Sequence, residues 1–168
     1  MAGLMADLGF WLDLEAQGIW LAADYNQVWP AVRVPSANDP TTAQGCSTVQ
    51  LAGLLARLHE RVLVGTEAST DMRDLLGRAG HWFHNKDVAD TDWVWPPSSD
   101  FRVTRGKVGI GPLQGNPRPA ISEGIIVHQL STNRNFVATY ANLLGPETKE
   151  NLTFAARAIE AAINGFRP

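Results

Sequence analysis

Residues 101–110 read Phe-Arg-Val-Thr-Arg-Gly-Lys-Val-Gly-Ile, an alternating segment rich in the residue types that favour β-strands. Two segments of the same character follow, at residues 120–130 and 135–143. The run of Gly, Pro and Asn at residues 111–119 joins the first two, and such short connections favour antiparallel neighbours over crossovers. Residues 100–143 therefore predict a three-stranded antiparallel meander.

Helices are predicted before this meander. Ser47 and Gln50 form a capping box, and the apolar residues after it recur at helical spacing until Gly65. The inward positions of this helix are Leu51, Leu54, Leu55, Leu58 and Val62. A second helix is expected over residues 66–76. Its inward positions are Met72, Leu75 and Leu76.

A last helix follows the strands. It begins near Pro146, and Glu147 suits the positive end of its dipole. Its predicted buried stripe is Leu152, Ala155, Ala156, Ile159, Ile163 and Phe166. Helices, then three antiparallel strands, then one covering helix make an α+β fold. We expect a single partial domain over residues 1–168, with a loop and helix region (1–46), helices (47–84), strands (100–143) and the C-terminal helix (146–166).

The composition excludes several classes of protein. Of the 168 residues, 45% are apolar and 18% charged, as in an ordinary globular domain. The net charge of −3, without runs of like charge, argues against nucleic acid or a membrane surface as a partner. The single cysteine, Cys46, excludes an internal disulfide framework. The first residues carry no signal-peptide pattern, and the localisation stays open.

Three patterns have the residue types of a functional site. His81 and His84 can share one helical face, but zinc needs three or four ligands and no carboxylate pair completes the set. Cys46 has no evident base and is expected to be a small, buried or half-buried residue. Residues 106–111 are glycine-rich, but a phosphate loop would lead from a strand into a helix. We predict no metal site and no cofactor.

The lysine within that glycine-rich segment keeps two interpretations. Lys107 stands between Gly106 and Gly109 on an otherwise apolar strand. Glycine weakens a strand and often marks the close approach of another backbone or a ligand. A lysine there gives the ligand a cationic partner. The alternative is a bulge with a solvated lysine, and composition alone favours neither.

The order of these segments resembles the C-terminal part of the penicillin-recognising serine hydrolases, most closely the class A β-lactamase-like branch. Lys107–Val108–Gly109 is similar to the Lys-Thr/Ser-Gly motif on the strand that walls their active site. Six further segments also resemble parts of that family. They are residues 39–42, the helix from Ser47, and residues 64–76, 122–127, 136–140 and 147–166. The resemblance implies that Lys107, Val108 and Gly109 bind substrate. It implies an amide, ester or β-lactam-like small molecule, hydrolysed through an acyl-enzyme in the full-length parent.

The sequence also departs from that family. No serine has a lysine three residues later, so the Ser-x-x-Lys nucleophile is absent, and so is Ser-Asp-Asn. Residues 18–44, where the deacylating glutamate would lie, contain no Glu. Val108 lacks the hydroxyl of the motif's Thr or Ser. We therefore predict a fragment of a β-lactamase-like serine hydrolase that has no catalytic residue of its own and is inactive alone.

A second function stays open beside the fragment hypothesis. The chain would then be a non-catalytic binding or interaction module that uses its exposed strand or its tryptophan-lined loops. In the fragment hypothesis, the apolar face of Leu4, Leu8 and Trp11 has lost its neighbours. Uncovered apolar surface of this kind favours self-association.

Overall fold

The computed structural model describes residues 19–21, 44–78, 95, 99–113, 116–144 and 149–166. The predicted α+β fold class is confirmed. In chain order the elements are β1 (Ile19–Leu21), β2 (Gln44–Cys46), α2 (Thr48–His59), α3 (Thr66–Arg78), β3 (Phe101–Leu113), β4 (Asn116–Gln129), β5 (Arg134–Leu144) and α4 (Lys149–Gly165). In this part of the chain, no helix is long and apolar enough to cross a membrane.

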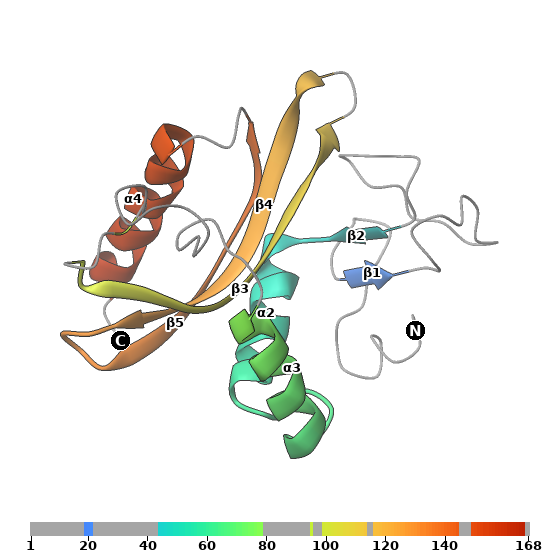
Figure 1. Ribbon diagram of the computed structural model, residues 1–168, viewed down its shortest axis with the longest axis vertical. Coiled ribbons are helices and arrows are strands. Elements are labelled where there is room, and N and C mark those ends of the chain that lie inside the picture. Colours follow the sequence, from blue (N-terminus) through green and yellow to red (C-terminus); the bar gives the residue numbers. More distant parts are fainter. Residues whose placement is uncertain are drawn as a thin grey trace.

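The three long strands form an antiparallel sheet in the order β3-β4-β5, which confirms the predicted meander (Figure 1). The predicted connection at residues 111–119 is mostly strand, because β3 and β4 stay paired as far as Pro112–Pro119 and Leu113–Asn116. The glycines and prolines of this run are therefore compatible with an extended hairpin end.

The central strand β4 is buried on both faces. Ile121, Ile125 and Val127 lie in the apolar cluster under α4, while Ile126 alternates to the other face and is also fully buried. Figure 1 shows α4 on one side of the sheet and α2 with α3 on the other. The sheet is thus the middle layer of three.

Helix α2 begins as predicted and ends earlier. Ser47 caps it, accepting a hydrogen bond from the Gln50 amide at 3.2 Å. It stops at His59, because Arg61 adopts a left-handed φ of 63° and the Val62 amide donates back to the Arg57 carbonyl oxygen. Val62 is consequently 62% exposed, and its predicted place on the buried face was wrong.

The predicted face of α3 was wrong at two residues, whereas that of α4 is confirmed except at Phe166. Helix α3 turns Ser69, which is fully buried, toward its neighbours, whereas Met72 and Leu75 are exposed. In α4 the predicted stripe is buried at Leu152, Ala155, Ala156 and Ile163. Phe166 follows the end of α4 and is exposed.

The N-terminal region contains one structure that the sequence did not predict. Strands β1 and β2 pair antiparallel, with Cys46 opposite Ile19, where only loops and helix fragments were expected. Several other predictions fall outside the described residues, namely those on residues 39–42, Leu4, Leu8, Trp11, His81, His84, Pro146 and Glu147.

Candidate functional site

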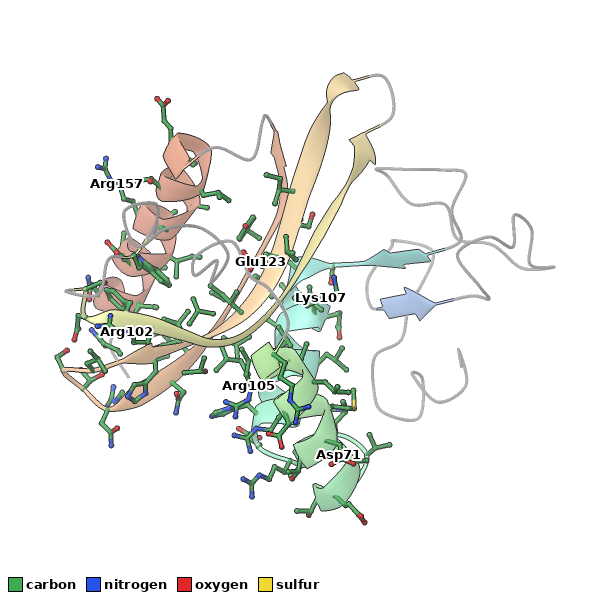
Figure 2. All side chains as sticks on the ribbon, viewed as in Figure 1. Asp71, Arg102, Arg105, Lys107, Glu123 and Arg157 are labelled. Atoms are coloured by element: carbon green, nitrogen blue, oxygen red, sulfur yellow. The ribbon has the colours of Figure 1, made fainter. Side chains whose placement is uncertain are left out.

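The motif segment lies on β3, an end strand of the described sheet. Lys107 pairs with Gly124 of β4, and Gly109 pairs with Ser122, so both motif residues occupy the same face. Lys107 is exposed, and its Nζ donates a hydrogen bond to the Val108 carbonyl oxygen (Figure 2). This face is the one on which α2 lies.

The bulge in β3 does not coincide with the lysine. The register shifts between Val103 and Arg105, where Thr104 donates from Oγ1 to the Ile126 carbonyl oxygen at 3.2 Å. From Arg105 to Pro112 the pairing with β4 is continuous. Lys107 therefore stands on regular strand, with its side chain in solvent.

Val108 occupies the opposite face from its two motif neighbours. Its partner in β4 is Glu123, and its side chain packs against the apolar cluster under α4. The structure thus brings Lys107 and Gly109 together on one face and uses the valine as a packing residue of the other. An apolar side chain suits that position better than a hydroxyl.

Basic side chains gather around the end of β3 that precedes the motif. Arg105 donates from Nε to the Arg73 carbonyl oxygen of α3 at 3.1 Å. The pKa of His59 is lowered, first by burial and then by Arg73 and Arg105. Burial followed by Arg105 and Arg61 also lowers the pKa of Arg73. Arg61, Arg73 and Arg105 thus lie near one another on the α2–α3 side of the sheet, where α3 also carries Glu67, Asp71 and Asp74.

Gly124 was not singled out in the sequence, yet it sets how closely α2 approaches the strand. A Cβ atom at this position would lie 2.6 Å from Cδ1 of Leu55 and 3.4 Å from Cδ2 of Leu51. Among the described residues, a Cβ at Gly109 would meet the Ser122 carbonyl oxygen at 3.8 Å, an ordinary contact. The close approach that the glycines of β3 suggested occurs at Gly124 instead. A glycine within the strand-forming segment 121–127 is the signal for it.

Glu123 is a buried carboxylate on β4, and it lies on the α4 side of the sheet. Glu123 is 1% exposed and accepts a hydrogen bond from the Tyr140 hydroxyl at 2.9 Å. Burial and then Glu123 raise the pKa of Tyr140 above its ordinary value. The pair faces away from Lys107, so it does not contribute to the motif face. Its sequence signal is an acid in phase with the inward residues Ile121 and Ile125.

Among the residues that the structure describes, no group of three His, Cys, Asp or Glu side chains could hold a metal ion. The motif face offers the Lys107 cation and the Gly109 backbone, on an end strand of the described sheet. A cation beside glycine backbone is chemically suited to orient a carboxylate, but it does not by itself supply a nucleophile.

Comparison with known proteins places the fold at a coarse level. No family model and no curated protein matches the sequence. A β-lactamase from Sphaerobacter thermophilus is similar in structure, with a TM-score of 0.56 and 16% identity over 99% of this chain and 53% of its own. This chain thus spans about half the length of that β-lactamase. The likeness supports a distantly β-lactamase-like fold.

Proposed function

We propose that this chain is the sheet-bearing part of a β-lactamase-like serine hydrolase. In this proposal, the segment Lys107–Val108–Gly109 forms the wall that binds the carboxylate of a small amide, ester or β-lactam-like substrate. Lys107 and Gly109 face the substrate, and Val108 contributes its backbone while its side chain packs on the other face. The observation that supports it best is the exposed Lys107 beside Gly109, on an end strand of the described sheet in a distantly β-lactamase-like fold. A charge-assisted hydrogen bond from Nζ would hold the carboxylate.

Turnover needs more than this wall. Acyl transfer requires an activated hydroxyl, a base within hydrogen-bond reach and donors for the oxyanion. No serine of this chain stands three residues before a lysine. The nucleophile of the proposed hydrolase therefore belongs to a part of the protein outside these 168 residues, and this chain alone binds substrate without hydrolysing it.

Binding tests the role of Lys107 directly. A penicillin should bind the chain, and Lys107→Ala should weaken that binding roughly 10- to 100-fold, because one charge-assisted hydrogen bond is lost. The penicillin methyl ester, which lacks the carboxylate, should bind the original chain as weakly as the acid binds the variant. Arg157→Ala removes an exposed charge from α4 and is the matched control. Equal affinities for the original chain and Lys107→Ala would exclude the proposed wall.

Turnover tests the absence of the nucleophile. Purified chain should release no product from a chromogenic cephalosporin. Hydrolysis that disappears when one serine is replaced by alanine would place the nucleophile within these 168 residues and contradict this part of the proposal.

The non-catalytic interaction module is the second candidate function. Exposed aromatic side chains on and beside α4, Phe154 and Phe166, favour it. A chain that binds no penicillin in any form but associates through these residues would have this function instead.

A further inference from the structure

Three elements meet on one face of the sheet, because α3 packs against both α2 and β3. His59 ends α2, and Arg61 follows it with its left-handed φ. Arg105 of β3 donates from Nε to the carbonyl oxygen of Arg73 in α3 at 3.1 Å, and Figure 2 shows its side chain beside this helix. The described chain thus forms a junction of α2, α3 and β3 through direct contacts.

Three buried polar atoms of this junction have no hydrogen-bond partner among the described residues. They are Nδ1 of His59, Oγ of Ser69 and Nε of Arg73. Ser69 is fully buried and lies one turn before Arg73, so both side chains are on the same side of α3. Buried polar groups in folded proteins are nearly always hydrogen-bonded to protein, water or a ligand. The junction therefore has donors for a bound polar group.

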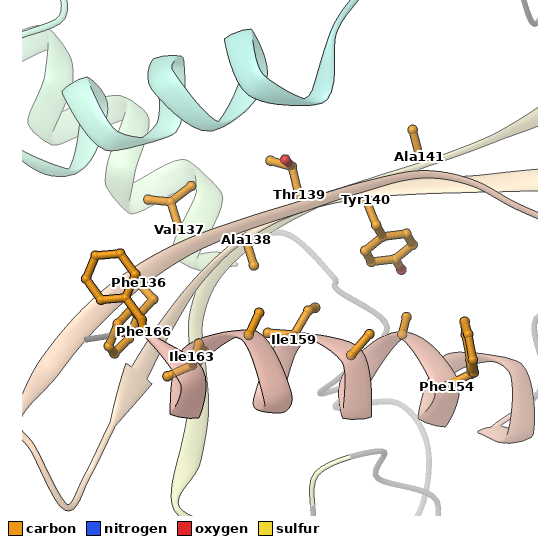
Figure 3. Close-up of a pocket in the computed structure, with 13 residues that line it drawn as sticks. Phe136, Val137, Ala138, Thr139, Tyr140, Ala141, Phe154, Ile159, Ile163 and Phe166 are labelled. Atoms are coloured by element: carbon orange, nitrogen blue, oxygen red, sulfur yellow. The ribbon is translucent and has the colours of Figure 1, made fainter. Parts of the chain in front are cut away.

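The other face of the sheet suits a different kind of ligand. Figure 3 shows the groove of about 700 Å³ between β5 and α4, and most of the side chains that line it are apolar. The buried carboxylate on that face, Glu123, already accepts a hydrogen bond from the Tyr140 hydroxyl at 2.9 Å. The three unpartnered atoms of the junction lie on the α2–α3 side, away from this groove.

Positive charges outnumber negative ones around His59. Its pKa is lowered first by burial, and then by Arg73 and Arg105. Arg61 lowers it further, and Glu60 is the carboxylate that acts in the opposite direction. Three guanidinium groups thus act on one half-buried imidazole, against one carboxylate.

The acidic side chains of α3 are on its other side. Glu67, Asp71 and Asp74 follow one another at intervals of four and three, so they form a row of their own. At 3.6 residues per turn, this row lies opposite the row of Ser69 and Arg73. Figure 2 shows Asp71 directed away from Arg105. Within the described part of the chain, the three arginines of the junction accordingly form no ion pair with a carboxylate.

We propose that the junction binds a small tetrahedral oxoanion, phosphate or sulfate. The guanidinium groups of Arg73 and Arg105 hold the anion by charge-assisted hydrogen bonds, for which their geometry is well suited. The Ser69 hydroxyl and the His59 imidazole donate to it from the buried side. Arg61, which is exposed, adds its charge on the solvent side. The bound anion thereby links α3 to β3.

Charge favours an anion over a water molecule at this position. A water molecule would satisfy the unpartnered donors but would leave the charges of the three arginines uncompensated. An oxoanion accepts several hydrogen bonds and also neutralises these charges. This argument uses only the contacts of α2, α3 and β3, so it does not depend on the proposed hydrolase function.

Binding should raise the pKa of His59, because the anion opposes the arginines that lower it. Nuclear magnetic resonance of the original chain measures this change without any substitution, first in chloride and then in phosphate at the same ionic strength. His59→Gln identifies the signal among the four histidines. Sulfate should act as phosphate does.

Calorimetric titration of phosphate into the full chain tests the contacts. Arg73→Gln and Arg105→Gln should each weaken binding at least 10-fold, because each removes a charge-assisted hydrogen bond. Ser69→Ala should weaken binding less, since it removes a neutral donor. Arg157→Gln removes an exposed charge from α4, on the other face, and is the matched control. Circular dichroism should show that all variants fold.

Lys107→Ala should leave phosphate binding unchanged, which separates this site from the proposed substrate wall. Phosphate binding that survives both arginine substitutions, or that Arg157→Gln weakens as much, would place the anion elsewhere. An equal response of the His59 pKa to phosphate and to chloride would mean screening by salt alone. No binding at all would mean that ordered water, or a carboxylate from another part of the protein, satisfies the junction. Each of these three results overturns the proposal.

Discussion

Arg61 ends helix α2 with a backbone conformation that suits glycine. Its φ of 63° lies in the left-handed region, where a Cβ atom is unfavourable. It also adds positive charge beside Arg73, whose pKa it helps to lower. Arg61→Gly should therefore raise the free energy of unfolding by about 0.5–1 kcal/mol in urea denaturation, after the greater flexibility of the unfolded chain is counted.

Arg61→Ala separates the two contributions, because it removes the charge and keeps the Cβ atom. We expect Arg61→Ala to raise the free energy of unfolding by less than Arg61→Gly does. If alanine stabilises as much as glycine, charge rather than backbone strain limits stability at this helix end.

Asp100 joins the start of β3 to the turn between β4 and β5. Its carboxylate accepts from the Ser131 amide at 2.8 Å, the Ser131 hydroxyl at 2.6 Å and Gln129 Nε2 at 3.0 Å. The Ser131 side chain is the largest cause of the lowered pKa of Asp100. These hydrogen bonds therefore stabilise the folded chain at pH values above 3.8, the ordinary pKa of the carboxyl group. This contribution to the free energy of unfolding is lost as the pH falls through the lower pKa that Asp100 has in the folded chain.

Asp100→Asn should remove the loss of stability that protonation of Asp100 causes at low pH. A plot of melting temperature against pH would then be flatter below about pH 4 than for the original chain. Ser131→Ala removes the strongest donor and should flatten the same region in part. Parallel curves for Asp100→Asn and the original chain would contradict this assignment.

At the scale of elements, α2 and β4 depend on the missing side chain of Gly124. Gly124→Ala would place Cβ 2.6 Å from Leu55, which is itself 5% exposed and has little room to move. We expect the variant to lose about 1–3 kcal/mol of stability through overpacking. Gly109→Ala is the matched control in the same sheet, since its Cβ meets an ordinary contact at 3.8 Å. Equal effects of the two variants on thermal unfolding would show that α2 does not pack against the strand as described.

The sequence predicted elements better than it predicted their faces. Alternation and short connections sufficed for β3, β4 and β5, because the pattern of a strand is local. In α3, Met72 and Leu75 were expected inward because they are apolar, but tertiary packing turns the side with Ser69 to the neighbouring elements. Periodicity defines which residues share a face, and the position of the neighbouring elements decides which face is buried.

In the candidate site, too, the sequence predicted single residues, whereas strand pairing and packing decide how they are arranged. Composition marked Lys107 as an unusual cation, and the register adds that Gly109 shares its face while Val108 lies on the other. Arg105, Arg73 and His59 are far apart along the chain, so no local pattern could predict that the fold brings them together. The buried pair of Glu123 and Tyr140 also depends on strand pairing, which brings residues 17 positions apart into contact.

At the scale of the whole molecule, β4 contributes buried side chains to the layers on both faces of the sheet. Ile125 and Val127 pack under α4, and Ile126 packs on the side of α2 and α3. Because all three belong to one strand, loss of either layer removes support from the other. We infer that the sheet and its helices unfold as a single cooperative unit.

Ile126→Ala tests this cooperativity. The side chain is fully buried, so its truncation should cost about 2–4 kcal/mol. In hydrogen exchange, the most protected amides of α4, which Ile126 does not face, should then exchange faster by on the order of 10²-fold, as should those of α2. Leu75→Ala, at an exposed position, should change neither helix. Faster exchange confined to α2 and α3 would mean that the two layers open separately, with α4 held to β4 by the apolar cluster of Ile121, Ile125 and Val127 alone.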